Sequence, residues 1–266
     1  MPPARAGARS AGHVEPLHDE VVAALRRIGN AERGEAIRRD RGSALQYLGI
    51  GFPALRARVK AGFSFTVGRP ADDAEVLHTW DALWRLSPWG DVLFAAIEFY
   101  APLVRGRRCA EVAPLLWPVL RGWHERVENW CHADALSGLY SRLLEARFDE
   151  VYPQLVAWNA AEDVWPRRLS LTSLVHYSGK NAVFLPPQRM LPLVARCVDD
   201  HRQPVEMALG WVLREMDRMH AGEVTRFVEQ HAPRMSARAL ARALEKRPPS
   251  ERAALMSLRR PAAAAA

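Results

Sequence analysis

Three short segments of the chain combine aromatic, acidic and basic residues at helical spacing. Trp130 and Asp134 are four residues apart, so on a helix an indole and a carboxylate share one face, one turn from each other. Arg168 ends a second segment that opens with an acid and an aromatic residue, and Trp211 precedes Arg214 by three residues in a third. A carboxylate beside indole faces can stabilise a developing positive charge, while guanidiniums suit phosphate oxygens.

These segments follow one another at intervals of about 40 residues, which is the length of one helix pair in a helical repeat. In such an array, equivalent helices of successive repeats line the same wall. We therefore expect Trp130, Asp134, Arg168 and Trp211 to meet there. A purely structural alternative stays open at this point, with both tryptophans in the core, the aspartate paired to a nearby arginine and Arg168 on a solvated helix face.

The elements that must position these residues are predicted to be short helices. Apolar residues recur with helical periodicity in segments of about 12 to 18 residues, separated by Pro, Gly or Asp, and no convincing alternating strand is found. The predicted helices cover residues 17–28, 53–62, 72–85, 89–103, 112–123, 136–144, 149–158, 164–177, 187–199, 204–219, 222–231, 236–246 and 250–258.

This succession predicts an all-α fold, a HEAT-like helical repeat solenoid with a concave DNA-binding groove. A compact helical bundle is the alternative. We expect a single domain over residues 16–258, between an N-terminal tail of residues 1–15 and a low-complexity C-terminal tail of residues 259–266.

Composition narrows the class of protein further. The 266 residues include 37 Lys and Arg against 30 Asp and Glu, a net charge of +7 carried mostly by arginine, which makes a nucleic-acid partner plausible. Three widely separated cysteines fit neither a disulfide framework nor a metal site, and no apolar run is long enough to span a membrane. Phosphate-binding glycine loops, HExxH, paired CxxC and GxSxG motifs are absent from the sequence, so we expect no cofactor and no metal.

The sequence resembles the AlkD-like bacterial DNA alkylation repair enzymes, which are HEAT-like solenoids. The resemblance spans roughly residues 40 to 247. It is carried by the segment YLGI at 47–50 with Pro53 and Arg56, by Trp130 with Asp134, by WPRR at 165–168 and by GWVLRE at 210–215.

The resemblance implies a DNA glycosylase that removes positively charged alkylated purines, of the 3-methyladenine and 7-methylguanine type, from duplex DNA. In that reading, Asp134 is the catalytic carboxylate, Trp130 and Trp211 pack against the sugar and backbone of the lesion nucleotide, and Arg168 holds a phosphate. Arg214 and Arg167 are further expected DNA contacts.

Such a reaction suits a site with one carboxylate. An N3- or N7-alkylated purine already carries positive charge and leaves as a neutral base, so no strong general acid is needed. Positive charge then develops on the sugar, where an ionised Asp134 can stabilise it and orient water.

A basic stripe near the C-terminus is a further expected DNA contact. Four cations recur every four residues and are predicted to lie along one side of a single helix: Arg234, Arg238, Arg242 and Lys246. A polyanion would relieve their mutual repulsion. The alternative is an ordinary solvated face partly paired with Glu245 and Glu251.

We therefore expect a cytoplasmic, nucleoid-associated monomer whose partner is double-stranded DNA containing alkylated bases. Two alternatives remain at this stage. One is a non-catalytic HEAT-type module that binds DNA or protein, although a carboxylate beside Trp130 would weaken phosphate binding in such a module. The other is a glycosylase of the same family dedicated to bulky alkyl adducts.

Overall fold

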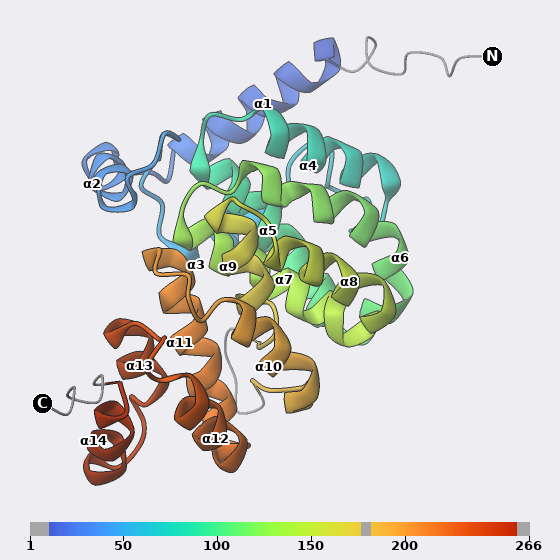
Figure 1. Cartoon of the computed structure of the whole chain (residues 1–266). Coiled ribbons are helices and arrows are strands. Elements are labelled where there is room, and N and C mark those ends of the chain that lie inside the picture. Colours follow the sequence, from blue (N-terminus) through green and yellow to red (C-terminus); the bar gives the residue numbers. More distant parts are fainter. Residues whose placement is uncertain (1–10, 177–181, 260–266) are drawn as a thin grey trace, which may run out of the picture. The chain divides into compact units, whose positions relative to one another are not determined.

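The computed structural model describes residues 11–176 and 182–259, and these residues are overwhelmingly helical (Figure 1). Within this described part, the strand-like pairings are two isolated bridges, Gln46 with Trp89 and Val175 with Val183. The chain divides into two compact units, Met1–Ala135 and Leu136–Ala266.

The first unit holds six α-helices and a short 3-10 helix among its described residues, and its last described residues begin a seventh helix, α7, that continues into the second unit. The bounds are α1 Ala11–Arg26, α2 Ala31–Arg41, α3 Phe52–Ala61, α4 Ala74–Leu86, α5 Gly90–Arg105, α6 Cys109–Leu120, the 3-10 helix η1 Arg121–Arg126 and α7 Trp130–Ala146.

Helix α5 forms the centre of the first unit, because it packs against α1, α3, α4 and α6. Its apolar residues are buried on almost every side, as expected for a helix enclosed by others. Large aromatic rings fill the space beside it: Trp84 and Trp123 stack with ring centroids 4.4 Å apart, and Trp84 Nε1 donates to the carbonyl of Trp123 at 3.0 Å. Buried indoles need such partners for their N–H groups.

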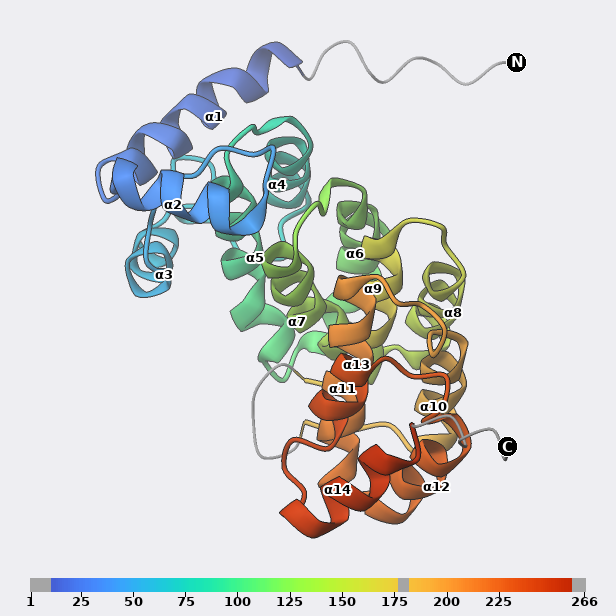
Figure 2. The same ribbon diagram turned by 60° about the vertical axis from the view of Figure 1, so that its left-hand side comes forward.

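The second unit arranges its helices in two rows. Helix α11 packs against both α9 and α13, while α10 contacts α8 and α12, and α12 contacts α14 (Figure 2). Consecutive helices alternate between the rows, as in helical repeats that stack helix pairs. The bounds are α8 Phe148–Asn159, α9 Val164–Thr172, α10 Pro187–Arg196, α11 Gln203–Asp217, α12 Ala221–His231, α13 Ala237–Ala243 and α14 Pro249–Ser257.

Most predicted helices are confirmed to within a few residues, and so is the all-α helical-repeat class. Local signals explain several boundaries: Ser236 accepts a hydrogen bond from the backbone N–H of Ala239, and Pro204 lies in the first turn of α11.

Several elements differ from the prediction. Helix α2 was not predicted, because its sequence AERGEAIRRDR lacks an apolar stripe and buries only Gly34. Helix α9 ends at Thr172, five residues before the predicted end. Residues 11–15 of the predicted N-terminal tail belong to α1, whereas residues 1–10 and 260–266 lie outside the described residues. The single domain over 16–258 stays a prediction.

Candidate functional site

Helix α7 begins with the two residues that the sequence singled out first. Trp130 is its first residue and is 45% exposed, although tryptophan is usually buried, so the interpretation of Trp130 as a core residue is wrong. Asp134 lies one turn further along and is buried. The start of α7 therefore presents an indole to solvent with a sheltered carboxylate behind it.

A buried asparagine starts the helix. The Oδ1 atom of Asn129 accepts hydrogen bonds from the backbone N–H groups of Cys131 and His132, both at 3.1 Å, which is the geometry of an N-terminal cap. Its Nδ2 atom donates to Tyr47 Oη at 3.1 Å and to His132 Nδ1 at 2.9 Å. Both polar atoms of the Asn129 side chain thus have hydrogen-bond partners, and these bonds fix the direction in which α7 leaves the preceding loop.

The imidazole of His132 completes this buried network. Because Asn129 donates to its Nδ1 atom, the ring carries its proton on Nε2, which donates to the carbonyl of Gly90 at 3.2 Å. Burial lowers the pKa of His132 to about 3, and the bond to the Gly90 carbonyl only partly opposes this shift. His132 is a neutral structural residue beneath Trp130.

The YLGI segment is held against the same region. One carboxylate oxygen of Asp91 accepts from the backbone N–H of Leu48 at 2.6 Å, and the other accepts from Ile50 at 3.3 Å. Burial raises the pKa of Asp91, and these backbone donors counteract it. Gly49 has a φ of 74°, and a Cβ atom there would lie 2.1 Å from the Asn30 carbonyl, so only glycine fits.

In the second unit, Arg168 and Arg167 lie on α9. Asp163 caps this helix by accepting from the backbone N–H of Trp165 at 3.0 Å. Arg168 is buried, and its Nη1 atom donates to the carbonyl of Pro204 at 2.6 Å, at the start of α11. Arg167 donates to the Asn159 carbonyl at 2.9 Å and pairs with Asp200 at 2.8 Å. Each guanidinium thus has a defined structural partner.

Trp211 and Arg214 lie on α11. The glycine before Trp211 allows close packing, because a Cβ atom on Gly210 would lie 2.5 Å from the Ala239 carbonyl of α13. Trp211 is half-buried. Arg214 forms ion pairs with Glu215 at 2.6 Å and Glu245 at 3.1 Å. The first residue of the GWVLRE segment therefore serves helix packing.

The basic stripe departs from its predicted geometry. Helix α13 covers only Ala237–Ala243, so the prediction that all four cations lie on one helix is wrong: Arg234 precedes it and Lys246 follows it. Every member also has an acidic partner: Arg234 pairs with Asp199, Arg238 with Glu206, and Arg242 and Lys246 with Glu245. Their role in DNA binding stays a prediction.

The four predicted catalytic residues divide between the two units. Trp130 and Asp134 belong to the first, and Arg168 and Trp211 to the second. That all four meet in one site stays a prediction. Asn129, His132 and Tyr47 were missed as supporting residues, and the signal that identifies Asn129 is its position directly before a helix, where asparagine is a preferred cap.

Residues 11–176 and 182–259 contain no cluster of three His, Cys, Asp or Glu side chains that could hold a metal ion. Cys109, Cys131 and Cys197 are not joined in disulfide bonds. Among the helices described, none is long and apolar enough to cross a membrane.

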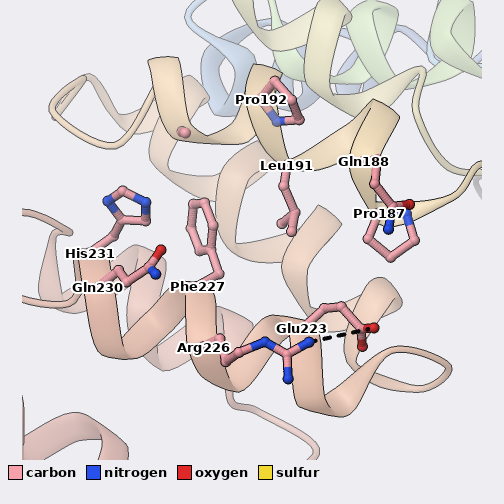
Figure 3. Close-up of a pocket in the computed structure, with 10 residues that line it drawn as sticks. Pro187, Gln188, Leu191, Pro192, Glu223, Arg226, Phe227, Gln230 and His231 are labelled. Atoms are coloured by element: carbon pink, nitrogen blue, oxygen red, sulfur yellow. Dashed lines mark ion pairs between the residues drawn. The ribbon is translucent and has the colours of Figure 1, made fainter.

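A surface pocket of about 440 Å³ lies between α10 and α12, within the second unit (Figure 3). Leu191, Pro192 and Phe227 form its apolar part, and the ion pair between Glu223 and Arg226 lies at its rim. None of the predicted site residues lines it. The pocket therefore gives no support to the predicted chemistry.

Comparison with known proteins connects this architecture to a family. The sequence model of the DNA alkylation repair enzymes matches residues 21–246. A solved structure described as a predicted DNA alkylation repair enzyme from Enterococcus faecalis has the same fold, with a TM-score of 0.67 and 15% sequence identity over 83% of this chain and 97% of the other. No curated protein matches the sequence. Because the family model covers most of the chain, this protein belongs to the family of DNA alkylation repair enzymes.

Proposed function

We propose that the protein is a DNA glycosylase that hydrolyses the N-glycosidic bond of positively charged alkylated purines in duplex DNA. The observation that carries this proposal is the start of α7, where an exposed Trp130 stands one turn from the sheltered Asp134. A repair role follows from the family, and 3-methyladenine and 7-methylguanine are the simplest bases with the required charge.

Asp134 is proposed as the catalytic carboxylate. The bond between the sugar C1′ atom and the purine nitrogen breaks, and its electron pair leaves with the base, which becomes neutral. The sugar is left with oxocarbenium character, which a nearby carboxylate stabilises most effectively when it is shielded from water. Water then adds to C1′ and loses a proton. The burial of Asp134 provides this shielding.

The tryptophans are proposed to act on the same charge. Trp130 exposes nearly half of its surface, which leaves its ring available to pack on the sugar and backbone of the lesion nucleotide. A ring face also attracts the positive charge of the sugar through its quadrupole. Trp211, half-buried on α11, is assigned the same role.

Arg168 is proposed to hold a phosphate beside the lesion, and Arg167 and Arg214 to contact the backbone nearby. Arg168 is oriented by its bond to the Pro204 carbonyl, and a planar guanidinium matches the geometry of phosphate oxygens. The net charge of +7 favours association with duplex DNA. We propose a monomer that works in the cytoplasm, associated with the nucleoid.

The test is release of free base. Purified protein is incubated with methylated duplex DNA, and free 3-methyladenine and 7-methylguanine are quantified, with Asp134→Asn in parallel. Release by the wild type that falls sharply in the variant supports the proposal. Binding of the duplex without release of either base would contradict it and favour a non-catalytic DNA-binding module.

A further inference from the structure

One arginine in the first unit lies over two aromatic rings, and one of its terminal nitrogens has no acceptor among the described residues. Arg41 is the last residue of α2, and its guanidinium lies over two aromatic rings, with Cζ 4.8 Å from the centroid of Tyr47 and 5.3 Å from that of Phe94. Stacking on two rings fixes the plane of the guanidinium. Arg41 is therefore a preorganised donor.

One donor of Arg41 has no acceptor in the part of the protein that the structure describes. Its Nη1 atom is buried, and no described residue accepts a hydrogen bond from it. On the same helix, Arg38 and Arg39 both lie within ion-pair distance of Glu35. A buried donor without a partner is costly, so an acceptor is expected from outside the chain.

The guanidinium of Arg41 lies within electrostatic range of the beginning of α7. Its electrostatic influence reaches Tyr47, Asp91, Cys131 and His132. His132 is neutral, the phenol and the thiol are protonated at neutral pH, and the carboxylate of Asp91 is bound to the YLGI backbone. The carboxylates of Asp40 and Asp134 also act on Cys131, but neither forms an ion pair with Arg41 among the described residues, so its guanidinium stays able to take an anion from outside.

We propose that Arg41 binds a phosphate group of duplex DNA beside Trp130. This inference rests on the proposed function, because it takes DNA as the ligand. A planar guanidinium can donate two parallel hydrogen bonds to a phosphate, and the aromatic rings beneath it keep those donors in place. The neighbouring indole is exposed and suited to the adjoining sugar. A free inorganic phosphate has the same chemistry and is the other possible source.

The salt dependence of binding to an undamaged duplex tests this contact without requiring base release. Arg41→Gln should lower the slope of log K against log salt by about 0.9, the value for one phosphate contact. Between about 50 and about 200 mM salt, wild-type affinity should then fall about 3.5-fold more than that of the variant. Arg41→Lys keeps the charge and should recover most of the slope.

Arg39→Gln is the matched control, because it removes the same charge from the same helix at a side chain that is 72% exposed. Its slope should stay at the wild-type value. Equal slopes for wild type and Arg41→Gln would overturn the proposal, and so would equal losses for Arg41→Gln and Arg39→Gln, which would indicate a diffuse charge effect. Base release by the wild type is measured separately, so failure of the glycosylase proposal is recognised independently.

Two further measurements separate a DNA contact from other roles. Arg41→Met should melt at or above the wild-type temperature, because it removes an unpaired donor; a large fall in melting temperature with an unchanged salt slope would make Arg41 structural. Inorganic phosphate, titrated at constant ionic strength, should not raise the melting temperature of the wild type. Suppose that phosphate raises the melting temperature of the wild type but not of Arg41→Gln, and that the two proteins have equal salt slopes for DNA binding. The anion is then free phosphate, and the DNA contact is refuted.

Discussion

Nδ1 of His132 lies 2.9 Å from Nδ2 of Asn129 on the buried side of the start of α7, and this contact holds the imidazole in its neutral form. A proton on Nδ1 would point at an amide that is itself a donor. The same amide group also donates to Tyr47, and its oxygen caps α7. One side chain, that of Asn129, therefore caps the helix that begins with Trp130 and also keeps His132 neutral.

Stability should accordingly fall in mild acid. The unfolded chain binds a proton at His132 below about pH 6.5, whereas the folded chain, with its pKa lowered to about 3, does not. The unfolded state thus binds more protons between these values, so the contribution is complete above about pH 6.5 and is lost as the pH falls toward 3, with a slope of at most about 1.4 kcal/mol per pH unit. Urea unfolding of wild type and His132→Gln from pH 7.5 to 4.5 checks this, and parallel curves would contradict it.

Trp130 should matter for activity much more than for folding. Trp130→Ala should change the free energy of unfolding by no more than about 1 kcal/mol, because nearly half of the residue is exposed to solvent. Base release should fall about 3- to 30-fold with the loss of the ring. Trp123→Ala is the matched comparison, since Trp123 is fully buried and stacked on Trp84, and should cost about 3–5 kcal/mol. Similar unfolding energies for the two variants would contradict this assignment.

Gly210 should be required for the contact between α11 and α13. An added Cβ atom would meet the Ala239 carbonyl at 2.5 Å, and we expect Gly210→Ala to destabilise the fold by about 1–3 kcal/mol. Gly138→Ala provides the control within α7, because nothing lies within 4 Å of the position of its Cβ, and it should stabilise by about 0.5–1 kcal/mol. Chemical denaturation of both variants tests the contrast, which would fail if the two shifts had the same sign.

Two residues of the basic stripe, Arg238 and Lys246, should differ in their contribution to stability. Arg238 pairs at 2.9 Å with Glu206, whose side chain is only 7% exposed, so Arg238→Gln leaves a buried carboxylate poorly neutralised and should cost about 1–3 kcal/mol. Lys246→Gln should cost less than about 0.5 kcal/mol, since Lys246 is 66% exposed.

Combining Arg238→Gln with Glu206→Gln should recover most of the lost stability, which urea unfolding would show. The salt slope of DNA binding by the folded double variant, compared with that of Glu206→Gln, then reports on Arg238. No recovery in the double variant would mean that the ion pair is not the source of the loss.

The sequence predicts a helix well where apolar residues recur on the face that is buried, as they do along α6, α7 and α11. It fails for α2, which buries almost nothing of its own, and for the end of α13. There, residues 244–246 have good helix propensity, but Arg247 turns back to pair with Asp217 and to donate to the carbonyl of Ala221. The local spacing of residues cannot predict contacts with partners so distant in the sequence.

The candidate site shows the same limit. Trp123 and Trp130 are the same residue type seven positions apart, yet one is fully buried and the other is 45% exposed. The spacing predicts that Asp134 and Trp130 share one face of a helix. It gives no indication that Asn129 and His132 hold the first turn of that helix through buried hydrogen bonds. Their contacts reach Tyr47 and Gly90, which are distant in sequence.

Catalysis by Asp134 is tested most directly by the single-turnover rate of base release from a duplex carrying one 7-methylguanine. Asp134→Asn, which removes the charge at nearly constant shape, should lower this rate about 100- to 1,000-fold, while the dissociation constant for the duplex stays the same or decreases. The melting temperature of the variant verifies that it is folded. A rate within about twofold of the wild type would contradict a catalytic role for Asp134 and with it the account of this site.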